Sequence, residues 1–512
     1  MKRLVTLGLA LVCHFAVAQS EETAKIEVLY GGYFSKSEDK YPGASIFERD
    51  ESGPVRFRHK GALLDCDIAY LYADENRLEA YGNIVFNQGD TLILNSKELI
   101  YSGITRLAEA RQKVRLTSPT STLTTETLYF DRKNQEAYYP SFGTLIDEEN
   151  TLKSNKGRYL IEQSLYRFEE SVTLENEKFN LISDRLDYHT EDEVADFFGP
   201  TTITGEDYTF YFEQGNYDTK NERGYGKTNT KINYDFRKLF GDSIYFNQFE
   251  NYAAASGQVK VLDSINESQL SAEFAEIFKA KDSLVATGEA IIAKRVESDS
   301  LYVHASYLFV TGPDKARDLF AYPNARFFKT DFSGKSDSIV VTNEKGITEL
   351  IGNPIIWSGE SQLTGNYIYF TNTPETNALD SLYVIENAFI ATLDTIAQIG
   401  YNQAKGVNLQ GKFLSNGLES ALLDKNAEVI YYLYDDKGAL IGINQTTCSA
   451  IRLSFEEGEI SRITFLRNPN GTLYPYTDFP EDQKLLEGFQ WFGEERTRDL
   501  ESFIEKIKGL KK

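Results

Sequence analysis

The residues at positions 80–101, AYGNIVFNQGDTLILNSKELIY, decide the fold class of this chain. Short apolar-alternating stretches at 84–86 and 92–94 lie on either side of an Asn-Gln-Gly-Asp segment at 87–90. A period of two is typical of a half-buried strand, and Gly and Asp are typical of a tight connection. The stretch therefore predicts two antiparallel strands joined by a turn.

Weaker copies of this pattern recur along most of the chain, about every 30 residues, which is a spacing typical of repeat architectures. The copies lie at 171–174 with 181–188, at 257–261, at 288–290, and at 352–354 with 363–370. Stacking one such unit many times buries its apolar face against its neighbours. We therefore expect an all-β, elongated stack of antiparallel strands, and such stacks more often bind or bridge than catalyse. The segment 271–280, SAEFAEIFKA, has a composition that also suits a helical turn, but its place in the repeat favours a strand.

Composition agrees with a β protein. Of 512 residues, 13% are aromatic and 41% hydrophobic, and aromatic side chains suit a pleated, half-buried surface. The formal net charge of -23 argues against nucleic acid as a partner, because nucleic-acid binding needs basic patches. It also argues against simple electrostatic adhesion to an anionic membrane surface.

The first residues are typical of a cleavable export signal. Lys2 and Arg3 are followed by an apolar run at 4–12 and by Ala16-Val17-Ala18 as a cleavage site. No later apolar run approaches the 20 or so residues needed to cross a bilayer as a helix. We therefore expect residues 1–18 to be a signal peptide and the mature chain to be exported and unanchored. Cys66 and Cys448 would remain, far apart in the sequence, and we expect two separate thiols.

Motifs for catalysis or metal binding do not stand out. His59, His189 and His304 are far apart, and no Cys-x-x-Cys, Gly-x-Ser-x-Gly or phosphate-binding loop occurs. Acid pairs such as Asp65 and Asp67 are expected by chance in a chain with 77 Asp and Glu residues. We therefore expect no enzyme activity, no metal and no cofactor.

What remains is the apolar face of the strands, whose side chains project to one side by alternation. Two interpretations stay open, because alternation does not distinguish a filled interior from a lined groove. One is a core filled by its own side chains, and the other is a groove that holds acyl chains. The candidate groove residues are Ile84, Phe86, Leu92, Leu94, Leu99, Tyr101, Val114, Leu116, Leu128 and Phe130.

The stretch from Leu78 to Tyr101 resembles the OstA-like family. Members carry Ala-x-Gly-Asn-Val and then Gly-x-x-x-Leu-x-Ala-Asp-x-Leu-x-Tyr. The chain matches this pattern at Ala80, Gly82, Asn83, Ile84, Gly89, Leu92, Leu99 and Tyr101, with Asn95-Ser96 in place of Ala-Asp. The second half recurs at 183–188, and the resemblance is strong over 63–204.

The resemblance implies a twisted β-jelly-roll that stacks head to tail with partner jelly-rolls through its edge strands. It also implies a groove for the acyl chains of lipopolysaccharide. On that basis we expect a periplasmic, outer-membrane-associated protein that binds and bridges lipopolysaccharide, with a homo-oligomer as a further kind of assembly. The alternative is a non-enzymatic structural or adhesive surface protein with a filled core.

The expected organisation has four parts: the signal peptide at 1–18, an OstA-like jelly-roll at 19–205, further β repeats at 206–475 and a helical tail at 476–512. In the tail, Asp478 to Glu481 are typical of a helix start, and Leu500, Phe503, Ile504, Ile507 and Leu510 recur at helical spacing. A short C-terminal helix is therefore predicted. It either covers the open end of the stack or docks a partner.

Overall fold

The computed structural model describes residues 24–89, 92–147, 149–296, 298–314, 316–330, 332–373, 378–414, 417–456 and 459–509. The predicted signal peptide lies outside these residues. The chain divides into two compact units, Met1–Glu191 (unit 1) and Asp192–Lys512 (unit 2). The boundary predicted at residue 205 stays a prediction.

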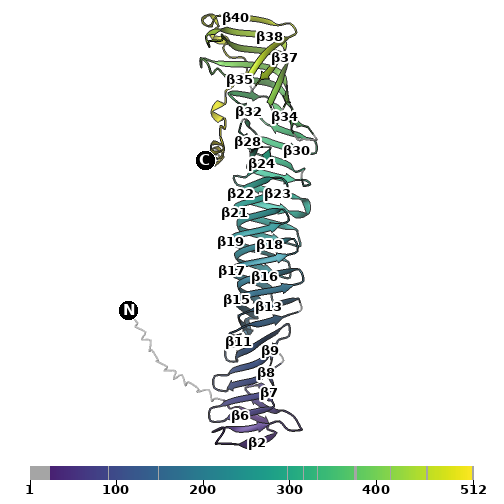
Figure 1. Ribbon diagram of the computed structural model, residues 1–512, viewed down its shortest axis with the longest axis vertical. Helices are drawn as coiled ribbons and strands as arrows, with labels where there is room; N and C mark the ends of the chain where they lie inside the picture. Colours follow the sequence, from purple (N-terminus) through teal and green to yellow (C-terminus); the bar gives the residue numbers. More distant parts are fainter. Residues whose placement is uncertain are drawn as a thin grey trace, which may run out of the picture. The chain divides into compact units, whose positions relative to one another are not determined.

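Unit 1 is a stack of antiparallel strands (Figure 1). Its elements are β1 (Glu27–Tyr30), β2 (Tyr33–Lys36), β3 (Ser45–Glu48), β4 (Val55–His59), β5 (Ala62–Cys66), β6 (Ile68–Tyr72), β7 (Arg77–Gln88), β8 (Leu92–Ser102), β9 (Leu107–Thr117), β10 (Thr122–Asp131), β11 (Glu136–Tyr139), β12 (Gly143–Ile146), β13 (Asn150–Ser154), β14 (Lys156–Leu160), the 3₁₀ turn η1 (Ile161–Gln163), β15 (Leu165–Asn176) and β16 (Phe179–His189).

Unit 2 continues the same kind of stack and ends in the tail. Its first strands are β17 (Val194–Gly205), β18 (Tyr208–Asp218), β19 (Arg223–Tyr234), β20 (Arg237–Asn247), β21 (Tyr252–Asp263), β22 (Ser268–Phe278), β23 (Ser283–Thr287), β24 (Ile291–Val296), β25 (Asp299–His304), β26 (Tyr307–Thr311), β27 (Asp318–Tyr322) and β28 (Ala325–Lys329), with the 3₁₀ turn η2 (Lys279–Lys281) after β22. The remaining strands are β29 (Phe332–Ser336), β30 (Ser338–Thr342), β31 (Ile347–Ile351), β32 (Ile355–Ser358), β33 (Ser361–Thr364), β34 (Tyr367–Asn372), β35 (Leu379–Leu393), β36 (Tyr401–Leu414), β37 (Gly417–Tyr434), β38 (Leu440–Glu456), β39 (Glu459–Leu466) and β40 (Asn470–Tyr474). The tail holds η3 (Tyr476–Asp478), η4 (Glu481–Gln483), η5 (Gly493–Glu495) and the helix α1 (Leu500–Gly509).

Many of the long strands have a break in register near the middle, and in some of them the two halves also pair with different neighbours. Residues 77–81 of β7 pair with β6 and residues 85–87 pair with β5, with a break in register between Tyr81 and Ile84. Gly82 lies in this break with a φ of +98°, a backbone conformation that side chains with a Cβ rarely adopt. A bulge of this kind bends a strand and increases its twist. The bend sends the two halves into two facing sheets, as in a jelly-roll.

The bends explain the repeat seen in the sequence. Pairs of residues with positive φ lie at many of the bends, at intervals of about 30 or about 60 residues, and include glycines of the repeat where these are present. Such pairs include 112–113 and 170–171 in unit 1, and 228–229, 257–258, 288–289, 352–353, 386–387 and 425–426 in unit 2. The all-β jelly-roll with a C-terminal helix is therefore confirmed, and 271–280 is confirmed as a strand over most of its length, within β22.

In the middle of unit 2 the two sheets consist of separate short strands. From β22, one series of paired strands runs through β23, β26, β27, β30, β31 and β34 to the first half of β35, and we call it ladder I. The other runs through β24, β25, β28, β29, β32 and β33 to the second half of β35, and we call it ladder II. The two ladders diverge at β22 and meet again at β35, so they enclose an interior between them.

The tail folds back along unit 2 instead of covering its end. In Figure 1 it returns from β40 to the level of β28. Phe503 and Ile507 of α1 are buried against Phe328 of ladder II, and Phe479 and Leu486 are buried against β35, β37 and β38. The expectation that the helix covers the open end of the stack is wrong, because its apolar face finds a partner on the side of ladder II.

The helix start predicted at Asp478 is also wrong. Tyr476–Asp478 and Glu481–Gln483 form single 3₁₀ turns, and α1 begins at Leu500. Between Gln483 and Leu500, backbone N–H groups of the tail donate hydrogen bonds to side chains of the sheet. Gln403 accepts from the Leu486 N–H at 2.9 Å, and Gln362 accepts from the Phe492 N–H at 2.8 Å. Tertiary contacts thus override the local helical signal in this segment.

Candidate functional site: an apolar cavity in unit 2

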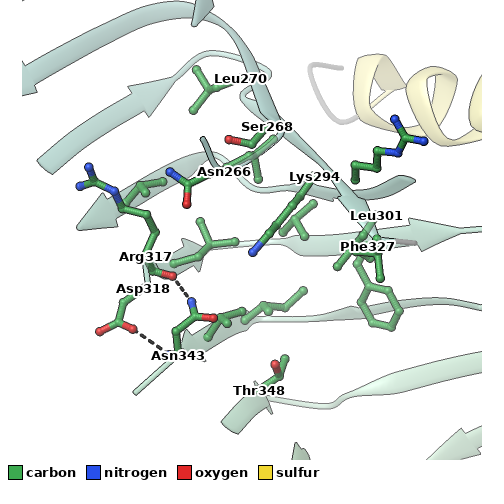
Figure 2. A pocket seen from close by; sticks show the side chains of 18 of the residues that line it. Asn266, Ser268, Leu270, Lys294, Leu301, Arg317, Asp318, Phe327, Asn343 and Thr348 are labelled. Atoms are coloured by element: carbon green, nitrogen blue, oxygen red, sulfur yellow. Dashed lines mark hydrogen bonds between the residues drawn. The ribbon is translucent and has the colours of Figure 1, made fainter. Parts of the chain in front are cut away.

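A cavity of about 1390 Å³ lies between the two ladders of unit 2. Leu319, Ile339 and Leu350 line it from ladder I, and Leu301 and Phe327 line it from ladder II. Figure 2 shows Leu301 and Phe327 on one side of this space and Asp318 and Asn343 on another. The lining extends from Asp207 to Ile460 and also includes Arg496 of the tail. Most of this surface is apolar, so the interior suits a ligand with long hydrocarbon parts.

The cavity lies in the part of the stack where aromatic side chains are less completely buried. The largest fully buried side chains among the described residues are aromatic rings, namely Phe57, Tyr101, Phe130, Phe168, Phe197, Phe210, Phe212 and, from the tail, Phe503. Apart from the tail residue they all precede residue 213. Further along, the inward positions of the ladders are mostly Leu, Ile and Val, which reach less far across the space between two sheets.

The ten candidate groove residues of unit 1 are brought together by the fold. They lie on β7 to β10 and are all buried, with exposed fractions between 0% and 3%. The Phe86 ring packs against those of Tyr101 and Phe130, with centroids 5.7 and 6.1 Å apart. None of the ten lines the cavity, whose described lining lies entirely in unit 2. A lipid groove at these residues stays a prediction.

Arg132 covers the interior of unit 1 at this level. Its guanidinium donates hydrogen bonds to the carbonyl oxygens of His59 and Lys60, both at 3.1 Å. It also donates to the Gln88 amide oxygen and the Tyr101 hydroxyl, both at 2.9 Å. One side chain thus joins turns on both sides of the stack. No sequence pattern predicts this role, since Arg132 lies in a polar turn.

The other chemically interesting side chains are occupied structurally. Asp65 pairs with Arg56 and Asp67 with Arg49, each at 2.7 Å. Cys66 and Cys448 are free, buried thiols in different units, so the expectation of two separate thiols is confirmed. Burial raises the pKa of Cys66 to about 12. A thiol with such a pKa is a poor nucleophile and a poor metal ligand.

Within the described residues, no group of three or more His, Cys, Asp or Glu side chains is placed to hold a metal ion. The described part of the chain also contains no helix long and apolar enough to cross a bilayer.

The fold and the cavity define a β-jelly-roll protein with an apolar interior, and comparison with known proteins gives part of the chain a family. Residues 38–184 match the OstA-like protein family. The resemblance predicted from the Leu78–Tyr101 stretch is therefore confirmed, and the chain carries an OstA-like region at 38–184. No curated protein matches the chain.

Among solved structures, the chain resembles LptH from Pseudomonas aeruginosa. LptH is described as the LptA-homologous periplasmic component of the conserved lipopolysaccharide transport device. The two chains are 15% identical, with a TM-score of 0.21, and the alignment covers 28% of this chain and 95% of LptH.

Proposed function

We propose that this protein is a periplasmic, outer-membrane-associated carrier and bridge for lipopolysaccharide, and that the cavity of unit 2 holds the acyl chains. The observation that carries the proposal is the apolar cavity between the two ladders. Its volume of about 1390 Å³ exceeds the usual range of small-molecule pockets, about 300–1,000 Å³. A lipid with several acyl chains matches both its size and its lining.

The driving force is the transfer of hydrocarbon out of water, worth about 25 cal/mol per Å² of apolar surface. It requires no catalytic group, which agrees with a protein that transports rather than transforms its ligand. The OstA-like region at 38–184 supports the assignment, because the family resemblance implies a role in lipopolysaccharide transport.

The proposal extends to the ten candidate groove residues of unit 1, which occupy the same inward face of the same repeat. Their side chains fill the interior, so an acyl chain enters there only if the Arg132 hydrogen bonds release. Unit 2 offers space without such a change, and we therefore place the ligand there first.

Partner jelly-rolls would add to the terminal strands through backbone hydrogen bonds, a common mode of recognition at sheet edges. β1 and β2 begin unit 1, and Val28, Leu29, Tyr33 and Phe34 on them are exposed. The last strands of unit 2 expose Ile441 and Leu473. Exposed apolar strands of this kind are otherwise an aggregation hazard. Other transport components or a second copy of the chain would cover them.

The second candidate is a structural or adhesive protein with a filled core. The packed interior of unit 1 favours it, and the cavity of unit 2 disfavours it.

Photo-crosslinking in cells distinguishes the lipid carrier from the structural protein. A reactive group at Leu319 or Val261 should give a lipopolysaccharide adduct, whereas Lys260, next to Val261 but exposed on the outer face, should not. Adducts at Phe86, Leu94 or Phe130, absent at exposed Arg115, would extend the groove into unit 1. A folded, exported protein without an adduct at any inward position would support the structural alternative.

A further inference from the structure

The open side of the unit 2 cavity is bordered by two rows of turns. One row, which we call lip A, contains the turns after β17, β19 and β21, at 206–207, 235–236 and 264–267. The other, lip B, contains the turns after β20 and β22, at 248–251 and 279–282, and the described residues 312–314 and 316–317 between β26 and β27. Backbone hydrogen bonds join successive turns within each lip, for example from Ser264 to Phe236 in lip A and from Lys279 to Asn251 in lip B.

Ion pairs join one lip to the other. Nη2 of Arg237 on lip A lies 2.7 Å from Oδ1 of Asp314 on lip B, although the residues are 77 positions apart in the chain. Nζ of Lys279 on lip B lies 3.5 Å from Oδ2 of Asp207 on lip A, and 4.2 Å from the centre of the Tyr234 ring. These contacts hold the two sides of the mouth together over the apolar interior.

The charge of the cavity lining is opposite in sign to that of the protein. The chain as a whole has 54 Lys and Arg against 77 Asp and Glu. The lining has eight cationic side chains against four carboxylates, Asp207, Asp263, Asp282 and Asp318. Six of the eight cations lie on or beside the lips described: Arg237, Lys238, Lys279, Lys294, Arg295 and Arg317. The lining of the cavity thus carries twice as many cations as carboxylates, although the lip turns also carry acidic side chains such as Glu267 and Asp314.

Lys294 adds a cation directed at the cavity. Its side chain extends from β24 into the space between the ladders, toward Arg317 and Asn343 (Figure 2). Within the described part of the chain, Lys294 forms no ion pair. Arg317 on the opposite lip is held by Asp314 at 2.6 Å and by the carbonyl oxygen of Asp282 at 2.6 Å. The Asp314 carboxylate therefore binds two guanidinium groups, those of Arg237 and Arg317.

We propose that this mouth is a binding site for the phosphate group of an anionic acyl lipid, and that the phosphate opens the mouth by ion-pair exchange. The phosphate takes the place of the Asp314 and Asp207 carboxylates on Arg237 and Lys279. The two lips then separate, and the acyl chains pass between them into the cavity. The inference rests on the proposed function for the cavity and adds the head-group chemistry and the residues that recognise it.

The exchange is physically favourable in both of its parts. The Lys279–Asp207 pair is about half exposed on each side, at 49% and 50%, and exposed ion pairs contribute little stability. Arginine binds phosphate through two parallel N–H···O bonds, and a phosphate carries more charge than the carboxylate that it replaces. Loss of the Lys279–Asp207 pair therefore costs little. Arg237 is 25% exposed and keeps its contact with Asp263, at 3.3 Å, when Asp314 is displaced, and the new contacts with phosphate are charge-assisted.

The test uses the purified full-length protein and two double variants of opposite charge effect. Arg237→Gln with Lys279→Gln removes the cations, and Asp314→Asn with Asp207→Asn removes the carboxylates. Both variants break the cross-lip pairs, so a purely mechanical latch predicts the same change for each. The matched control is Arg223→Gln, since the Arg223–Asp218 ion pair (3.3 Å) lies beside a turn of unit 2 and neither residue lines the cavity. Circular dichroism and thermal unfolding check that each variant is folded.

The probes are phosphatidic acid and a diacylglycerol with the same acyl chains, presented in mixed detergent micelles. Removing the cations should weaken phosphatidic acid binding about tenfold or more and spare diacylglycerol. Removing the carboxylates should strengthen phosphatidic acid binding, and Arg223→Gln should change the binding of neither lipid.

Competition by inorganic phosphate alone would assign the site to the free anion instead of the lipid head group and would overturn the opening by a lipid. Equal binding of both lipids by all variants would overturn the head-group site while the apolar cavity stands. Binding of neither lipid by the native protein would overturn both proposals.

Discussion

The side chain of Gln362 holds the backbone of Phe492, 130 residues later in the chain. Its Oε1 accepts a hydrogen bond from the Phe492 N–H at 2.8 Å, while its Nε2 donates to the carbonyl oxygen of Gln490 at 2.5 Å. Gln403 repeats the arrangement with the Leu486 N–H at 2.9 Å and the Lys484 carbonyl at 2.8 Å. Both glutamines are buried. A side-chain amide thus offers the tail the same donor and acceptor pair as a neighbouring strand would.

Replacing Gln362 by Leu should release the tail from unit 2. The change removes two hydrogen bonds and leaves a buried N–H and carbonyl of the tail without partners, which costs about 1–3 kcal/mol for each group. Hydrogen exchange at residues 484–497 and proteolysis of the tail should both accelerate, while the amides of β18 to β22 stay protected. Gln410→Leu is the control, because Gln410 is exposed on β36 and its side-chain amide donates to the Tyr383 hydroxyl, at 3.4 Å, rather than to the tail. Unchanged exchange in the tail of Gln362→Leu would show that the apolar contacts of Phe479, Leu486 and Phe503 suffice.

Gly82→Ala should destabilise unit 1 by more than Gly61→Ala does. Both glycines have positive φ, +98° and +83°, so both substitutions carry the backbone cost of about 1–2 kcal/mol. An added Cβ at Gly82 would lie 2.5 Å from Cβ of Asp67, whereas at Gly61 it would meet nothing within 4 Å. Asp67 also accepts a hydrogen bond from the Asn83 N–H at 2.9 Å, so its displacement would disturb the bend of β7. Urea unfolding of the two variants measures the difference, and equal losses would mean that the bend adapts to the clash.

Leu94→Ala should cost more stability than Leu319→Ala, although the chemical change is the same. Leu94 is 1% exposed in the packed interior of unit 1, where Leu→Ala substitutions cost about 2–5 kcal/mol because they leave a cavity. Leu319 already borders empty space in unit 2, so its truncation breaks fewer packing contacts. Hydrogen exchange of the β8 and β27 amides provides a local readout in each unit. Equal losses would indicate that the unit 2 cavity is as tightly packed in solution as the unit 1 core.

The strands and their inward faces could be predicted from the sequence because period two is a local signal. Ile84, Phe86 and Leu94 project inward as expected, and the C-terminal helix at Leu500–Gly509 follows its helical spacing. The cavity could not be predicted from alternation, because Leu319 in an open interior and Leu94 in a filled one follow the same pattern. The difference lies in how completely the rings are buried: the fully buried aromatic rings of the stack all precede residue 213, whereas Phe327 and Phe370 line the cavity, and alternation does not encode that difference.

The position of the tail and the charge of the mouth depend on residues far apart in the sequence. Phe503 of α1 packs on Phe328, and Arg237 pairs with Asp314 across turns of opposite lips. No local pattern encodes such pairs, since the register of many strands decides which turns face each other. The net charge of the whole chain could not indicate the cations of the lining, because a net charge averages over surfaces that the fold separates.

Cys66 and Cys448 should both resist thiol reagents in the native protein at pH 8 and react once it is unfolded. Burial raises the pKa of both thiols, that of Cys66 to about 12, so the reactive thiolate is scarce at this pH. Mass spectrometry of the labelled protein should show two blocked thiols only after denaturation in urea. Cys66→Ser serves as the control for assigning the two labels. Rapid labelling of Cys66 in the native state would reveal local opening of β5.

Unit 1 should lose stability as the pH falls below about 6.5, and His59 should be one cause. Burial lowers the pKa of His59, and the nearby cations of Arg132, Lys60 and Arg106 lower it further. In the unfolded chain its pKa is near 6.5, so between the two values the unfolded state binds more protons than the folded state. Stability is therefore complete above about pH 6.5 and declines as the pH falls toward the folded-state pKa. Urea titrations from pH 8 to pH 5 should give a flatter profile for His59→Gln than for the native protein, whereas His189→Gln tests the loss of another imidazole from the same unit. An identical pH profile for His59→Gln and the native protein would show that His59 protonation is not linked to folding, and that Arg132 tolerates a charged imidazole beside it.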